Sequence, residues 1–167
     1  TGKTPPTNRD DFFGGDIPFL TPTDMLDGHK SVNTGRALTI AGLAVVKNCL
    51  VPKGVAVSCI GWQMGKSVLV NVPTVSNQQI NTIIVDESRF DISFVYYLLA
   101  SMRDQIFELG ATATRTPIVN KSTFSQIKAL VPSLLVQRQI AEFCAALDDR
   151  ITLLRETNAT LEAIAQA

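Results

Sequence analysis

Apolar residues near the C-terminal end of the chain recur in alternating steps of four and three. The first of two interleaved series consists of Ile140, Leu147, Leu154 and Leu161, and the second of Cys144, Ile151, Asn158 and Ala165. This alternation is the heptad pattern of a coiled coil, in which both series lie along one side of a helix. The pattern predicts a helix from about residue 135 to residue 165, roughly 45 Å long at 1.5 Å per residue.

Two arrangements of this helix fit the pattern. It either pairs with a second helix or lies flat on its own domain. A helix of this length is longer than a small globular body needs. Asn158 interrupts an otherwise apolar series, and a polar residue at such a position weakens packing but fixes the register between helices. Both points favour a specific partner helix.

Shorter apolar runs in the first half of the chain predict strands, because each is bounded by turn-forming residues. The expected strands cover residues 17–20, 55–60, 67–72 and 79–85. Residues 52–54 and 61–65 are interpreted as turns, and residues 73–77 as a break between two strands. A short helix is expected near Thr39.

The helical spacing returns after residue 90. With Asp91 or Ser93 as the N-cap, a single helix is predicted to end at Gly110. Its apolar positions, three or four residues apart, are Phe94, Leu98, Met102, Ile106 and Leu109. Residues 121–127 predict one or two further turns. The expected fold is α+β: a β-rich globular domain with a few short helices over residues 1–132, followed by the long coiled-coil helix over residues 133–167.

Charge is unevenly distributed along a chain whose formal net charge is zero. No Asp or Glu lies between Asp27 and Asp86 or between Glu108 and Glu142, whereas Lys and Arg occur in both stretches. If the two stretches fold side by side, they form a cationic surface suited to a polyanion. The alternative is chance clustering on a mostly apolar protein.

No catalytic site is predicted. Gly65-Lys66-Ser67 resembles the end of a phosphate-binding loop, but Ile60 stands where that motif needs its first glycine, and a strand rather than a helix follows. His29 is the only histidine, and the three cysteines are embedded in apolar surroundings typical of reduced core residues. We therefore expect no metal, no disulfide and, without a secretory signal or a membrane span, a cytoplasmic location with no membrane partner.

Four stretches, in order, resemble the DNA specificity subunits of type I restriction-modification systems. They are Gly14 to Met25, Ser58 to Lys66, Ser76 to Asn81, and Gly110 to Ala141 with Leu147, Asp149 and Ile151 beyond it. Each stretch is weakly specific alone, but their shared order over nearly the whole chain is a strong signal. Full-length members of the family carry two recognition domains and two conserved helices. This sequence has one recognition domain and one such helix, which implies a half-subunit or a piece of a longer subunit.

The resemblance implies a non-catalytic function. Residues 1–132 would be a target-recognition domain that reads one half of a bipartite double-stranded DNA site through base edges, and the helix would be a spacer for dimerisation. The partner would be a second copy or a second half. Modification and restriction subunits would dock on the chain and carry S-adenosylmethionine, ATP and Mg, so that no cofactor is expected here. The alternative is a protein-assembly module that does not bind DNA.

Candidate contacts come from the loops within the carboxylate-poor stretches. The DNA-binding candidates are Lys30, Arg36, Ser58, Trp62, Gln63, Lys66, Gln78, Gln79, Thr112, Thr114, Arg115 and Lys121. Trp62 is equally consistent with a core position, and Gln78 and Gln79, if they alternate across a strand, place only one amide toward DNA. The helix-interface candidates are the eight residues of the two heptad series.

Overall fold

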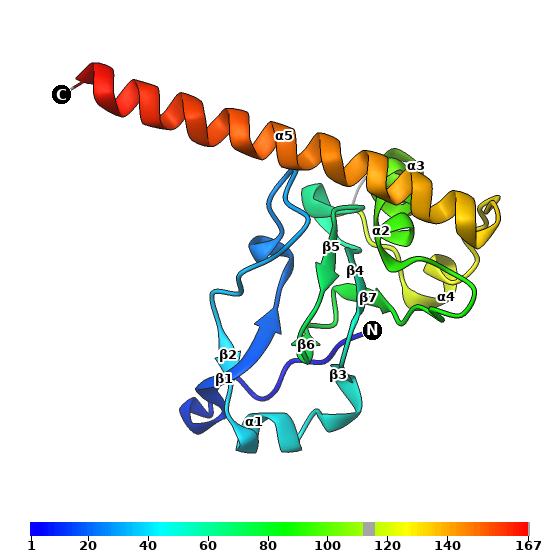
Figure 1. Cartoon of the computed structure of the whole chain (residues 1–167). Coiled ribbons are helices and arrows are strands. Elements are labelled where there is room, and N and C mark those ends of the chain that lie inside the picture. The colour runs from blue at the N-terminus through cyan, green and yellow to red at the C-terminus, as the bar shows by residue number, and fades with distance from the viewer. Residues whose placement is uncertain (112–115, 167) are drawn as a thin grey trace.

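Seven strands form two small sheets within the residues that the computed structural model describes, which are 1–111 and 116–166 (Figure 1). One sheet has the order β2-β1-β6-β3 and the other the order β5-β4-β7. The strands are β1 (Phe13–Leu20), β2 (Ala37–Leu38), β3 (Leu50–Val51), β4 (Gly54–Ser58), β5 (Ser67–Val70), β6 (Thr74–Ser76) and β7 (Ile80–Ile83). The α-helices are α1 (Ile40–Ala44), α2 (Ile92–Ser101), α3 (Arg103–Gly110), α4 (Lys121–Phe124) and α5 (Leu134–Gln166), with 3-10 turns at Asp10–Phe12, Pro22–Asp24, Lys47–Cys49 and Gly61–Gln63.

Strand β4 is the centre of the body, and it is buried on both faces. Val55 and Val57 point into a cluster formed with α2 and α3, whereas Ala56 points the other way, into a cluster with Leu20 and Met25 beside the first sheet. This double burial explains why the sequence of β4 is almost continuously apolar rather than alternating. The fold is α+β, as expected.

Strand β6 was not expected, since residues 73–77 were interpreted as a break. Thr74–Ser76 lies between β1 and β3, parallel to the first and antiparallel to the second, and all three residues are buried. Three residues are too few to display a period of two. Their strand conformation depends on backbone hydrogen bonds to partners distant in sequence, which no local pattern reports.

The helix expected between residues 91 and 110 is two helices. Asp91 caps α2 by accepting a hydrogen bond from the backbone N–H of Phe94 at 2.9 Å, but the helix ends before Met102 and α3 begins at Arg103. The hydroxyl of Ser101 donates to the carbonyl of Leu98, a contact that bends helices. Leu99 before the bend and Ile106 after it are both buried, so the apolar spacing continues while the axis changes direction.

The two short helices form where polar caps were available. The side chain of Thr39 accepts from the N–H of Gly42 at 3.1 Å at the start of α1, which confirms the helix expected there. Asn120 accepts from the N–H of Thr123 at 2.9 Å at the start of α4. The latter helix ends at Phe124 and is shorter than residues 121–127 suggested.

The long helix α5 confirms the helix predicted over residues 135–165 to within a residue at each end. At 1.5 Å per residue it is about 50 Å long, and Figure 1 shows its C-terminal half projecting beyond the body. Every described residue from 149 to 166 is exposed. The helix therefore does not lie flat on its own domain along its length. No helix in the described part of the chain is long and apolar enough to cross a bilayer.

The N-terminal half of α5 is fixed to the body by polar contacts. Gln137 is only 1% exposed. Its amide oxygen accepts from the N–H of Asp91 at 3.0 Å, and its amide nitrogen donates to the carbonyls of Arg89 and Pro132 at 3.3 and 2.9 Å. Farther along, the hydroxyl of Tyr97 donates to Asp148 at 2.8 Å; burial, and then this hydrogen bond, raise the pKa of Tyr97, so the phenol stays protonated.

We expect Gln137→Ala to lower the free energy of unfolding by about 1–3 kcal/mol, because it removes the three hydrogen bonds by which a buried side chain ties α5 to the body. Chemical denaturation followed by circular dichroism measures this difference. Gln139→Ala, at an exposed position on the same helix, is the matched control and should change stability by less than about 0.5 kcal/mol. Equal effects of the two substitutions would contradict the role assigned to Gln137.

Candidate nucleic-acid interface

The two carboxylate-poor stretches meet in the structure. The N–H of Gly61 donates to the carbonyl of Pro117 at 2.8 Å, and the N–H of Val119 donates to the carbonyl of Cys59 at 2.9 Å. Ile60 and Ile118 form an antiparallel bridge between these bonds. The segment after β4 and the segment before α4, which are more than fifty residues apart in the sequence, are therefore side by side.

The turn of residues 61–66 is held in one conformation by its own backbone. Hydrogen bonds run from Met64 N to Gly61 O at 3.1 Å, from Lys66 N to Gln63 O at 3.1 Å and from Gly65 N to Ser58 O at 2.8 Å. Gly65 has a φ of 78°, and a Cβ there would lie within 3 Å of Arg103. Only glycine permits both this conformation and the close approach of α3.

Lys66 and Ser67 lead directly into β5, as the sequence indicated, and not into a helix. The N–H groups of a helix N-terminus, which bind phosphate in nucleotide-binding loops, are therefore not available at this turn. Together with Ile60 in place of glycine, this geometry argues against a nucleotide site.

An ionic cluster beside the turn joins three separate segments. Asp27 pairs with Lys66 at 2.9 Å and with Arg103, the first residue of α3, at 2.8 Å. The hydrogen bond from Lys66, followed by the charge of Arg103, holds the pKa of Asp27 below its ordinary value. The Lys66 side chain is only 11% exposed, and its ammonium also donates to the carbonyl of Met25. Lys66 is thus at the predicted site, but its charge is offset by Asp27.

Trp62 is on the surface and is not a core residue. Its side chain is 86% exposed, and one face of its ring stacks on Phe107, with centroids 6.1 Å apart and planes at 23°. Arg103 donates to the backbone carbonyl of Trp62 at 3.4 Å. Arg103 and Phe107 are one helical turn apart on α3, so a single face of that helix supports the turn.

Neither Asp27 nor Arg103 was among the predicted site residues. Arg103 lies within the helix predicted from apolar spacing, in a carboxylate-rich part of the chain. Asp27 is only the last carboxylate before a carboxylate-poor stretch begins. Nothing local to either residue indicates that they meet. Arg103 reaches the turn only because α3 packs against Gly65.

Ser58 is fully buried on β4, which corrects its assignment as a contact residue. Its hydroxyl has no hydrogen-bond partner among the described residues. Because β4 is buried on both faces, the side chain of Ser58 is buried regardless of the face on which it lies. The loop pattern from Ser58 to Lys66 suggested a surface position because it did not show where the strand ends.

Gln78 and Gln79 lie in the turn between β6 and β7, not on a strand as expected. The exposed Gln78 accepts a hydrogen bond from the hydroxyl of Thr4 at 2.7 Å. The half-buried Gln79 accepts from the side chain of Asn77 at 3.2 Å. Both amide oxygens are therefore already engaged within the chain.

The remaining candidates occupy different elements. The ammonium of Lys30 is 5.6 Å from the ring centroid of Tyr97, and the guanidinium of Arg36 is 4.0 Å from that of Phe13, in the other sheet. Lys121 is exposed at the start of α4, and Gln63 is half-buried next to Trp62. Thr112, Thr114 and Arg115 lie outside the described residues. The structure thus groups Trp62, Gln63 and Lys66, while Arg36 and Lys121 belong to other parts of the body.

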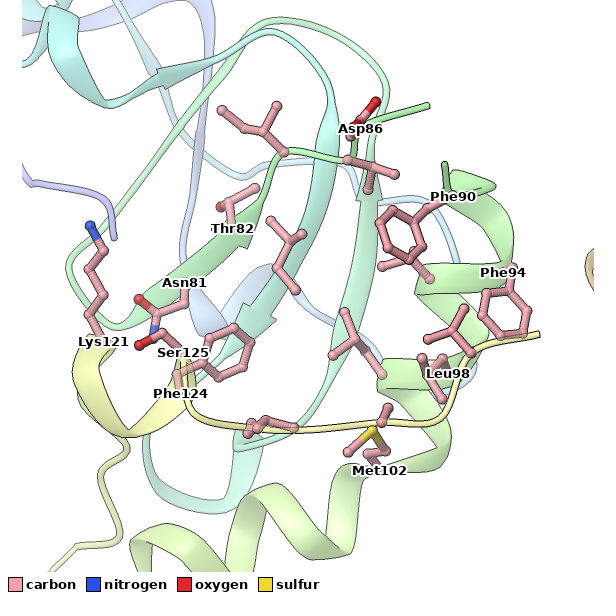
Figure 2. A pocket seen from close by; sticks show the side chains of 18 of the residues that line it. Asn81, Thr82, Asp86, Phe90, Phe94, Leu98, Met102, Lys121, Phe124 and Ser125 are labelled. Carbon is pink, nitrogen blue, oxygen red and sulfur yellow. The ribbon is translucent and has the colours of Figure 1, made fainter. Parts of the chain in front are cut away.

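Among the clefts that the described residues form outside this turn, two are of note. The larger, about 540 Å³, is lined mainly by apolar side chains of β7, α2 and the segment after α4, with Asn81, Lys121 and Ser125 at one end (Figure 2). A second cleft of about 430 Å³ separates residues 28–31 from α5 and carries both charge signs, including Lys30, Asp148 and Arg155. No group of three His, Cys, Asp or Glu side chains in the described residues is arranged to hold a metal ion.

The cysteines are free thiols in the structure. Cys59 is buried, whereas Cys49 and Cys144 are half-buried. Burial raises the pKa of the Cys59 thiol, despite an opposing hydrogen bond from Asn81, so the protonated form is favoured. A protonated, buried thiol is a poor nucleophile and a poor metal ligand.

Helix α5 presents one apolar stripe to solvent. At about 100° per residue, the exposed large side chains within roughly 40° of Leu147 are Val136, Ile140, Phe143, Ile151, Leu154 and Leu161. Asn158 and Ala165 complete the stripe, which we call the α5 seam. A second side, roughly 100° around the helix from Leu147, carries Gln137, Ala141 and Asp148, which face the body.

The position of the body shifts the seam away from the heptad expectation. Cys144 is half-buried at the border with the body-facing side, whereas its neighbour Phe143 is exposed and lies in the seam. Successive seam residues from Ile140 are separated by three, four, four and three residues. Two consecutive steps of four amount to a local interruption of the heptad, which unwinds a coiled coil.

The chain matches known proteins along almost its full length. The family model for the type I restriction modification DNA specificity domain matches residues 1–163. The specificity subunit of the type I restriction enzyme HindI from Haemophilus influenzae is 34% identical over 135 residues, which cover 79% of this chain and 29% of that protein. The MjaIX specificity subunit from Methanocaldococcus jannaschii is 27% identical over 98% of this chain and 38% of its own length.

A solved structure gives independent support for the fold. A chain from work on the assembly and conformational transition of the type I R-M system superposes with a TM-score of 0.71 at 14% identity, covering 97% of this chain and 38% of that one. The chain spans well under half the length of these relatives. The family match over residues 1–163, together with the curated relatives, establishes that this chain belongs to the type I restriction modification DNA specificity domain family.

Proposed function

We propose that this chain is a DNA sequence-recognition part of a type I restriction-modification complex and that its contact surface is centred on the turn of residues 61–66. The observation that carries the proposal is the joining of the two carboxylate-poor stretches at Cys59–Gly61 and Pro117–Val119. Two cations, Lys66 and Arg103, lie at this junction with one carboxylate between them. A surface poor in acids and rigid in its backbone suits a polyanion with a fixed geometry.

The body and the helix have separate tasks in this proposal. The body reads one half of a bipartite target, and α5 sets the distance to a second recognition domain, carried by another copy or another half of the natural protein. Modification and restriction subunits dock around this pair. Methyl transfer, ATP use and cleavage belong to those subunits, and the chain contributes recognition without catalysis.

The α5 seam supports the second task. It consists of seven large apolar side chains, with Leu147 at the centre, that remain exposed along about 40 Å of helix. Exposed apolar stripes of this extent mark interaction surfaces. A second helix of the same pattern covers such a stripe by interdigitation.

Duplex DNA binding should weaken steeply as salt is raised, because neutralising phosphates releases counterions. Asp27→Asn should tighten binding about two- to fivefold at low salt, the range expected when an exposed carboxylate no longer neutralises its cationic partners. Fluorescence anisotropy with a labelled mixed-sequence duplex, titrated at several salt concentrations, measures both effects.

Asp10→Asn is the control, because it removes one exposed carboxylate outside the cluster and matches the change in net charge. It should alter affinity by less than about twofold. If Asp27→Asn behaves like Asp10→Asn, the cluster is not part of the DNA surface. Affinity that is independent of salt, or no binding at all, would favour the protein-assembly alternative.

We expect Leu147→Asp combined with Leu154→Asp to abolish pairing through α5, because two charges would be placed within the apolar seam. Sedimentation equilibrium should show the wild-type chain associating and this variant as a monomer. The control is Leu135→Asp with Leu153→Asp, two exposed leucines about 120° away from the seam, which should leave the mass unchanged. Loss of association in both variants would show that the seam is wrongly placed.

A further inference from the structure

Trp62 is the only tryptophan of the chain, and its highly exposed side chain is carried by a backbone that is held in place. An aromatic ring stabilises a fold mainly by burying its large apolar surface. An indole exposed to water therefore contributes little to the stability of the fold. Here the indole stacks only loosely on Phe107, with centroids 6.1 Å apart, and Trp62 stays 86% exposed, so no described residue covers the face turned away from Phe107. The free face is a flat apolar surface ready to receive a planar group.

The turn that carries Trp62 is rigid before any ligand arrives. Its backbone is tied to Pro117 through the N–H of Gly61 and to Arg103 through the carbonyl of Trp62. The neighbouring Met64 is fully buried and acts as an anchor. A turn whose backbone is already held loses little backbone entropy on binding, which is the advantage of a preorganised contact.

We propose that the free face of Trp62 is a stacking platform for a nucleobase of bound DNA, at a step where that base has lost a stacking neighbour. This inference rests on the proposed function and deepens it. A nucleobase fits because it is planar, every base has a π-face, and its phosphates suit the cations beside the ring, Lys66 and Arg103.

The charge around the ring favours a nucleobase over an aromatic side chain of a protein partner. Aromatic anchors of protein interfaces lie in well-packed, desolvated centres. Trp62 is instead flanked in sequence by Gly61 and Gln63, and the Asp27–Lys66–Arg103 cluster adjoins its backbone. A protein partner with a planar side chain is kept as a separate outcome of the test.

The single tryptophan provides a direct test, because intrinsic fluorescence reports on this position alone. The chain is titrated at low salt with three labelled probes: a fully paired duplex, the same duplex with one central mismatch, and a single-stranded thymidine oligonucleotide. Anisotropy of the label measures binding, and tryptophan emission measures stacking. We expect emission to be quenched by the mismatched duplex and the single strand, and the mismatched duplex to bind more tightly than the paired one.

Two variants separate stacking from general affinity. Trp62→Ala should lose the preference for the mismatched duplex and weaken binding to the single strand by about fivefold or more, the cost of removing one base–aromatic contact. Trp62→Phe should retain most of that preference, since it keeps a planar ring. Circular dichroism checks that both variants fold, and removal of an exposed side chain should leave the fold intact.

Each remaining outcome overturns a different claim. Binding of all probes without quenching, and with the mismatch preference unchanged in Trp62→Ala, would refute the platform while leaving the proposed function standing. Failure of every DNA probe to bind would refute the proposed function itself. Quenching by a purified modification subunit, but by none of the DNA probes, would assign Trp62 to a protein interface and refute the inference.

Discussion

The short backbone pairing of Cys59–Gly61 with Pro117–Val119 is the constraint on which the candidate interface depends. It joins two stretches of chain that share no local sequence relation and places their carboxylate-poor segments together. The same pairing fixes one end of the turn of residues 61–66, while the approach of α3 to Gly65 fixes the other. The orientation of Trp62 and the Asp27–Lys66–Arg103 cluster both follow from this arrangement.

Charge at this interface is balanced rather than simply positive. Asp27 lies between two cations, so the cluster carries one net positive charge and holds both side chains in place. An exposed ion pair contributes little to stability. Its effect here is on geometry, because it links the segment after β1, the start of β5 and the start of α3. A chain of zero net charge can in this way keep a local surface suited to phosphate.

Helix α5 divides its surface between two neighbours. Gln137, Ala141 and Asp148 face the body, and the α5 seam lies roughly 100° farther around the helix, exposed to solvent. The polar contacts of Gln137 and Asp148 fix the rotation of the helix about its axis, which in turn decides that Phe143 rather than Cys144 lies in the seam. The orientation of any partner helix relative to the recognition turn is therefore set by hydrogen bonds at the root of α5.

The sequence by itself determined the long helix, most strands, the α+β class and the family, because heptad spacing, apolar runs and motif order are local or sequential properties. It also pointed to Trp62, Gln63 and Lys66. Only the tertiary structure decided that Ser58 is buried, that Thr74–Ser76 forms a strand, that the helix breaks at Met102, and that Asp27 and Arg103 join the site. Those features depend on contacts between residues far apart in the chain, and pairing of distant backbone and side-chain groups leaves no periodic trace in the sequence.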